Sequence, residues 1–100
     1  MDIAAPAGTP IMAVDKGTVV RVDQRASEGK NVIIDHGNGW KTYYYHASVL
    51  LAQVGQTVNQ GDVIALVGRT GFATGNHLHI EFWYGGRPYN PAQFVGSKSR

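Results

Sequence analysis

Turn signals recur along this 100-residue chain at short intervals that suit strands. The chain contains 13 glycines, and its β-branched aliphatic residues, Val and Ile, number 17 against 4 leucines. This composition favours strands and tight turns over a helical bundle. Asn38-Gly39 between two apolar runs is the strongest hairpin signal, and Gly85-Gly86 is a second one. Because the strands alternate with turns and not with long helices, we predict an all-β chain with a mainly antiparallel sheet.

The predicted elements are short and fill one domain, residues 1–95. Residues 47–53 are the only plausible helix, and residues 90–94 are a candidate for one closing helical turn. A Gly-x-x-aliphatic block occurs at Gly8 and again at Gly55, which a duplicated strand–turn unit would explain. The predicted strands are 17–22, 31–35, 40–45, 63–67 and 77–84.

Charge and cysteine content exclude several classes of function. The formal net charge of +2 comes from Lys98 and Arg100 in a basic tail, residues 96–100, since residues 1–96 carry seven basic and seven acidic side chains. No basic stripe interleaves with aromatic residues, so nucleic-acid binding is not expected. The chain has no cysteine, which excludes disulfides, thiol catalysis and thiolate zinc sites.

The N-terminal sequence carries no recognisable signal peptide, and no apolar run approaches the ~20 residues of a membrane span. The absence of a signal peptide leaves two expectations. Either the protein stays inside the cell, or the chain is a piece of a longer protein.

Two of the four histidines lie close together on one predicted strand. His77, His79 and Glu81 occupy alternate positions and therefore share one face, while Leu78 and Ile80 face the other way. Two adjacent imidazoles above an apolar face suit a metal ion or proton transfer. A pair of exposed polar residues on a half-buried strand would show the same spacing.

The remaining candidates are weaker when taken alone. His46 closes a predicted strand and is expected on the same face as Thr42 and Tyr44, as a strand-end surface residue. His36 lies at a turn and is interpreted as structural. Asp2 precedes the apolar Ile3, and by composition it is a mobile terminal acid.

The order and spacing of several motifs resemble those of the lysostaphin-type (LytM-like) zinc metallopeptidases. The resemblance covers residues 2–95, and its most specific part is the block from Gly75 to Glu81. The motifs are Asp2-Ile3-Ala4-Ala5-Pro6-Ala7-Gly8-Thr9-Pro10, Gly17-Thr18-Val19, His36-Gly37-Asn38-Gly39, Tyr45-His46, Gly55-Gln56-Thr57-Val58, Gly68-Arg69-Thr70-Gly71, Gly75-Asn76-His77-Leu78-His79-Ile80-Glu81 and Asn90-Pro91.

The resemblance implies a small antiparallel β sandwich or barrel-like fold with a groove, the duplicated hybrid motif. It also implies one zinc ion and hydrolysis of stem or cross-bridge peptides in peptidoglycan. The implied metal ligands are Asp2 and His79, the implied catalytic residues are His46 and His77, and the implied substrate-binding residues are Tyr44 and Asn76.

The chain departs from the family pattern at its N-terminus. The family motif is His-x-x-x-Asp, and with Asp2 as its last residue the histidine would lie before Met1. We therefore expect the chain to lack one zinc ligand and to have a truncated N-terminal strand. A missing edge strand would expose unpaired backbone groups, so an edge-strand dimer is a further expectation.

Three interpretations remain open. The chain is a fragment of a zinc endopeptidase whose parent acts on peptidoglycan peptides in the cell envelope or outside the cell. Alternatively, it is a catalytically inactive LytM-like module that binds or activates a partner in the envelope, although the intact His46, His77 and His79 count against this. A lipoyl or biotin carrier with Lys16 as the modified residue is disfavoured, because a carrier has no use for His-x-His beside a tyrosine-rich strand.

Overall fold

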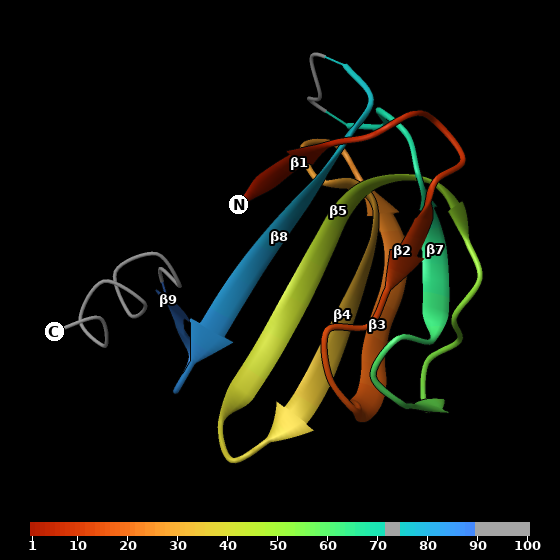
Figure 1. Ribbon diagram of the computed structural model, residues 1–100. Coiled ribbons are helices and arrows are strands. Elements are labelled where there is room, and N and C mark those ends of the chain that lie inside the picture. Colours follow the sequence, from red (N-terminus) through yellow and green to blue (C-terminus); the bar gives the residue numbers. More distant parts are fainter. Residues whose placement is uncertain (72–74, 90–100) are drawn as a thin grey trace, which may run out of the picture.

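The computed structural model describes residues 1–71 and 75–89, and these residues form strands and turns without a helix (Figure 1). The prediction of an all-β chain is thus confirmed. Nothing in the described part of the chain is a helix long and apolar enough to cross a membrane. The strands are β1 (Asp2–Ala4), β2 (Pro10–Met12), β3 (Gly17–Arg25), β4 (Gly29–Gly37), β5 (Trp40–Leu50), β6 (Thr57–Val58), β7 (Val63–Val67), β8 (His77–Tyr84) and β9 (Arg87–Tyr89).

All pairings between these strands are antiparallel, as predicted. The main path through the sheet is β1-β8-β5-β4-β3-β6. Strand β7 branches from β5 and pairs with β2, while β9 extends the edge of β8. Figure 1 shows the long strands β8, β5, β4 and β3 side by side, with β2 and β7 adjacent to one another.

The hydrophobic core lies between the long strands and the β2–β7 pair. Ile11 of β2 and Ile64 of β7 belong to the same buried cluster as residues of the long strands. Burying one such aliphatic side chain contributes about 1.5–3 kcal/mol. The cluster's largest fully buried side chains are Tyr44, Ile11, Ile34, Ile64, Val19, Val32, Val58 and Val67. One face of the long-strand sheet is therefore covered by the core.

Both predicted hairpins are confirmed. Asn38 and Gly39 have φ values of 53° and 85°, and Gly85 and Gly86 have values of 60° and 80°. Two consecutive residues with positive φ are what a tight type I′ hairpin turn requires. The first turn joins β4 to β5 and the second joins β8 to β9.

The predicted helix over residues 47–53 is wrong. Strand β5 continues to Leu50, because its last residues pair with β7, with Ala47 opposite Val67 and Leu50 opposite Ala65. This long-range pairing overrides a weak local helix preference. The candidate helical turn at 90–94 and the boundary between residues 95 and 96 lie outside the described residues.

Candidate active site

The side chains of β8 alternate between the core and the opposite face of the sheet, as the sequence predicts. Leu78 and Ile80 are buried in the core, whereas His77, His79 and Glu81 are only partly buried. The histidines thus lie on the face that the β2–β7 pair leaves open. A pocket of about 440 Å³ lies elsewhere, at the hairpin end of the sheet. That pocket is lined by Val14, Asp15, His36, Gly37, Asn38, Trp40, Thr42 and Phe82.

Strand β1 brings Asp2 to the two histidines. It pairs antiparallel with β8, with Asp2 opposite His79. The Asp2 Oδ1 atom lies 2.6 Å from His79 Nδ1 and 3.6 Å from His77 Nε2. The hydrogen bond with His79 lowers the pKa of Asp2 below its ordinary value and outweighs the opposing effect of burial. A carboxylate and two imidazoles therefore meet at the edge of the sheet.

Glu81 holds the other side of the His79 ring. Its carboxylate accepts hydrogen bonds from Tyr45 Oη at 3.0 Å, from Trp83 Nε1 at 3.1 Å and from His79 Nε2 at 3.1 Å. Partial burial tends to raise the pKa of Glu81, but the bonds from Trp83, His79 and Tyr45 outweigh it and lower the pKa. The Tyr45 ring also stacks on His79, with ring centroids 5.5 Å apart. Asp2, Glu81 and Tyr45 all contact the His79 ring, and together they fix its orientation.

Strand alternation predicts Glu81 beside the histidines, but it indicates no role for Glu81 or Tyr45. Burial raises the pKa of Tyr45, and the nearby Glu81 carboxylate raises it further, so the hydroxyl stays protonated and can donate. The i and i+2 spacing of His79 and Glu81 was the available signal. The register that places Tyr45 opposite His79 depends on pairing between β5 and β8, which no local pattern reveals.

The predicted facing of His46 is wrong. Lys30 pairs with Ala47 and Val32 with Tyr44, so two residues of β5, Tyr45 and His46, lie opposite the single residue between them on β4. His46 is the extra residue of this β-bulge, with a φ of 69°. The bulge breaks the alternation of side chains along β5.

The consequence of the bulge is that His46 joins the other histidines. Its ring centroid is 5.1 Å from that of His77 and 6.4 Å from that of His79. The side chain is 9% exposed, so it is not the strand-end surface residue that its position suggested. Asp2, His46, His77 and His79 come from three strands far apart in the sequence and meet on one face.

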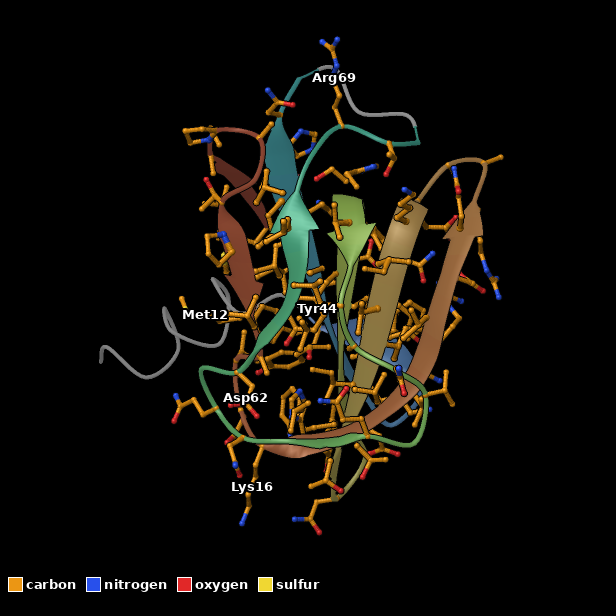
Figure 2. The ribbon with its side chains drawn as sticks, turned by 90° about the vertical axis from the view of Figure 1, so that its right-hand side faces the viewer. Met12, Lys16, Tyr44, Asp62 and Arg69 are labelled. Carbon is orange, nitrogen blue, oxygen red and sulfur yellow. The ribbon has the colours of Figure 1, made fainter. Side chains whose placement is uncertain are left out.

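The two predicted substrate-binding residues have different outcomes. Tyr44 is 1% exposed and lies in the core, as Figure 2 shows, so it does not line a groove. It alternates with Tyr43 and Tyr45, and that alternation directs its ring inward. Asn76 is exposed just before β8, and its role stays a prediction.

His36 is structural, as interpreted. Its Nδ1 atom bonds the Lys16 carbonyl at 2.7 Å, and its Nε2 atom bonds Thr42 Oγ1 at 2.7 Å. Both ring nitrogens are thus engaged at the hairpin end of the sheet.

The described residues on their own do not complete a zinc site. A catalytic zinc ion takes three protein ligands and one open position. Within residues 1–71 and 75–89, no group of three or more His, Cys, Asp or Glu side chains is arranged to hold a metal ion. Asp2 and His79 are adjacent and present an oxygen and a nitrogen atom to the same point on this face.

Comparison with known proteins agrees with this geometry. The sequence profile of peptidase family M23 matches residues 1–91. The chain belongs to peptidase family M23. It is 44% identical over 89 residues to the peptidoglycan DD-endopeptidase ShyA of Vibrio cholerae, and the match covers 89% of this chain and 21% of ShyA. The chain is therefore a domain of a metallopeptidase family, and it spans only about a fifth of that relative.

Two solved structures share the M23 fold. One is the catalytic domain of the prophage-encoded M23 protein EnpA from Enterococcus faecalis, solved as a point mutant. It has a TM-score of 0.86 and 35% identity, over 91% of this chain and 73% of that one. The other is a zinc-containing peptidase from Vibrio cholerae, with a TM-score of 0.85 and 39% identity, over 88% of this chain and 27% of that one. The open antiparallel sheet is thus the fold of M23 catalytic domains.

Proposed function

We propose that this chain is the catalytic domain of a zinc-dependent endopeptidase that hydrolyses stem or cross-bridge peptides of peptidoglycan. The convergence of Asp2, His46, His77 and His79 on the open face of the sheet is the observation that carries the proposal. The similarity to a peptidoglycan DD-endopeptidase supports the choice of substrate. Such a substrate places the parent protein in the cell envelope or outside the cell.

Asp2 and His79 are the proposed metal ligands of this chain. His79 Nδ1 and Asp2 share a hydrogen bond at 2.6 Å, and a metal ion held by both residues would take the place of its proton, while Nε2–H would still donate to Glu81 at 3.1 Å. A carboxylate behind a histidine ligand commonly sets the ring in this way. The third ligand in this proposal is a histidine four residues before Asp2, on a segment that precedes Met1 in the parent protein. A zinc ion held by Asp2, His79 and that histidine would lower the pKa of a water molecule and so supply the nucleophile near neutral pH.

His46 and His77 are the proposed groups that handle protons. His46 Nδ1 lies 2.7 Å from the Thr70 carbonyl, and His77 Nδ1 lies 3.0 Å from the Gly75 carbonyl. A carbonyl only accepts hydrogen bonds, so each neutral ring carries its proton on Nδ1 and keeps a lone pair on Nε2. Two such lone pairs can orient the attacking water and accept its proton, and the resulting imidazolium can donate to the leaving amine.

A second candidate is an inactive envelope module that binds peptidoglycan or activates a partner. The observation that favours it is the absence, within the described residues, of a group of three metal-binding side chains. The two functions differ in what they require of zinc. Hydrolysis needs the metal, whereas binding does not.

The test compares this chain with a version whose N-terminal extension places a histidine four residues before Asp2. Calorimetry measures zinc affinity, and mass spectrometry measures peptides released from purified peptidoglycan. We expect the extended chain to bind one zinc ion and to release peptides, and the 100-residue chain to bind zinc at least ~10-fold more weakly.

Substitutions in the extended chain provide the controls. His79→Ala is expected to abolish zinc binding, whereas His36→Gln, at the opposite end of the sheet, leaves it intact. An extended chain that binds zinc but releases no peptide would contradict the enzymatic proposal. Binding to peptidoglycan without cleavage would favour the inactive module.

A further inference from the structure

Thr70, in the connection between β7 and β8, forms hydrogen bonds to β4 and β5, the two strands that pair at the bulge. Its main-chain carbonyl oxygen lies 2.7 Å from His46 Nδ1. Its hydroxyl donates to the Ala47 carbonyl at 2.6 Å and accepts from the Lys30 main-chain N–H at 3.0 Å. The hydroxyl thus holds the Thr70 backbone in the place where its carbonyl meets the His46 ring.

The turn before β4 packs directly against this loop. A Cβ atom on Gly29 would lie 2.4 Å from the Thr70 carbonyl carbon and 2.5 Å from its oxygen. A Cβ atom on Gly71 would lie 2.5 Å from Gly29 N and 2.5 Å from the Ser27 carbonyl oxygen. Only glycine at both positions allows this close approach. In Figure 2 the neighbouring Arg69 points away from the molecule. Of these two residues, Thr70 is therefore the one whose side chain is bonded to the strands.

The same turn holds the unusual backbone of His46. The His46 main-chain N–H donates to the Glu28 carbonyl at 2.9 Å. A φ of 69° is uncommon for a residue with a side chain, and surrounding contacts must stabilise it. The main chain of His46 is therefore held by the Glu28 carbonyl, and its ring is held by the Thr70 carbonyl.

We infer that Thr70 is a positioning residue, which sets both the orientation and the tautomer of His46. The Thr70 carbonyl retains the proton on Nδ1 and leaves the Nε2 lone pair for proton transfer. Thr70 does not contact the reacting atoms and acts through His46. The inference rests on the proposed function, since it matters for hydrolysis only if His46 handles the proton.

The first measurement reads the His46 ring without any reaction. Nitrogen-15 NMR spectra of the 100-residue chain report which ring nitrogen carries the proton. We expect Nδ1–H in the unsubstituted chain and in Thr70→Ser, which keeps the hydroxyl. We expect a mixture of tautomers in Thr70→Val, which has the same shape without the hydroxyl. Thr18→Val, on an exposed position of β3, is the matched control and should leave the ring unchanged.

The second measurement is hydrolysis by the zinc-binding extended chain. A misplaced general base loses much of its contribution of ~10²–10⁴-fold, so Thr70→Val should lower kcat by about tenfold or more. KM should change less than about twofold, because the bonds of Thr70 are to Lys30, His46 and Ala47 and its proposed effect is on His46. Thr70→Ser should restore kcat.

The outcomes separate the inference from the proposed function. An Nε2–H tautomer in the unsubstituted chain, or an unchanged ring in folded Thr70→Val, would overturn the positioning role. The spectrum of the unsubstituted chain tests the expected tautomer even if Thr70→Val does not fold, and Thr70→Ser then tests the hydroxyl. A ring that changes in Thr70→Val, in an extended chain that hydrolyses nothing, supports the positioning role and contradicts the enzymatic proposal.

Discussion

Tyr44 places a hydroxyl group inside the apolar core. The hydroxyl accepts a hydrogen bond from the Val14 N–H at 3.1 Å and bonds Thr42 Oγ1 at 2.7 Å. Thr42 in turn bonds His36, so a chain of hydrogen bonds links the core to the hairpin end of the sheet. Burial raises the pKa of Tyr44, which keeps the hydroxyl protonated. This residue therefore has a structural function.

Tyr44→Phe tests that function. The substitution keeps the ring but leaves the Val14 N–H and the Thr42 hydroxyl without this partner, which costs about 1–3 kcal/mol of unfolding free energy. Urea unfolding measures the loss. Tyr84→Phe removes the hydroxyl of a tyrosine that is 51% exposed, and it should change stability by less than about 0.5 kcal/mol. Equal stability of the two variants would argue against a role for the buried hydroxyl.

Individual site residues were predictable wherever strand alternation holds. His77, His79 and Glu81 share a face because β8 is regular, so the sequence alone placed them correctly. His46 was misplaced because a bulge depends on the pairing of β5 with β4, and Tyr44 because either face of an isolated strand can be the inner one. Which face of the sheet these side chains occupy depends on pairing between strands distant in the sequence, and local periodicity does not reveal that pairing.

At the scale of elements, the turn between β3 and β4 connects fold and site. Gly29 is in the left-handed region, with a φ of 67°, and the Thr70 backbone covers the position of a Cβ atom. Gly8 has a φ of 88°, but nothing lies within 4 Å of its Cβ position. The two glycines therefore separate the cost of backbone strain from the cost of close packing.

Gly29→Ala should destabilise the domain more than Gly8→Ala. Both substitutions introduce backbone strain of about 1 kcal/mol or more, but only the first also displaces the loop at Thr70. Thermal unfolding measures the difference, and the NMR spectrum of His46 should change only in Gly29→Ala. Similar unfolding temperatures for both variants would show that the loop at Thr70 moves at little cost in stability and does not hold His46 in place.

The sequence also predicted the long strands and both tight hairpins, since these are encoded by neighbouring residues. The end of β5 was mistaken for a helix because residues 47–50 carry no local strand signal. Their state is decided by β7, which lies more than a dozen residues further along the chain. A segment that is a strand only because it pairs with a distant strand is harder to predict than a hairpin whose turn residues are adjacent in the sequence.

At the scale of the whole molecule, β1 is the strand at one end of the main path through the sheet, as far as residues 1–71 and 75–89 are concerned. The Met1 and Ile80 main-chain groups bond each other in both directions at 2.8 Å. In an antiparallel pair such bonding alternates along the strand, so Met1 and Ile3 face β8 while Asp2 and Ala4 direct their N–H and C=O groups outward. Within the described residues, β1 pairs with β8 alone. An unpaired edge of this kind favours association with another strand.

We expect the 100-residue chain to dimerise through β1 as its concentration rises. Ala4→Pro removes an outward N–H without disturbing the bonds to β8, so it should keep the chain monomeric. Ala7→Pro is the matched control, because the bond from Thr9 N–H to the Pro6 carbonyl and the φ of 88° at Gly8 describe a type II turn that accepts proline at Ala7. Light scattering at increasing concentration distinguishes these cases. A monomeric mass for the unsubstituted chain at every concentration would show that β1 does not mediate self-association.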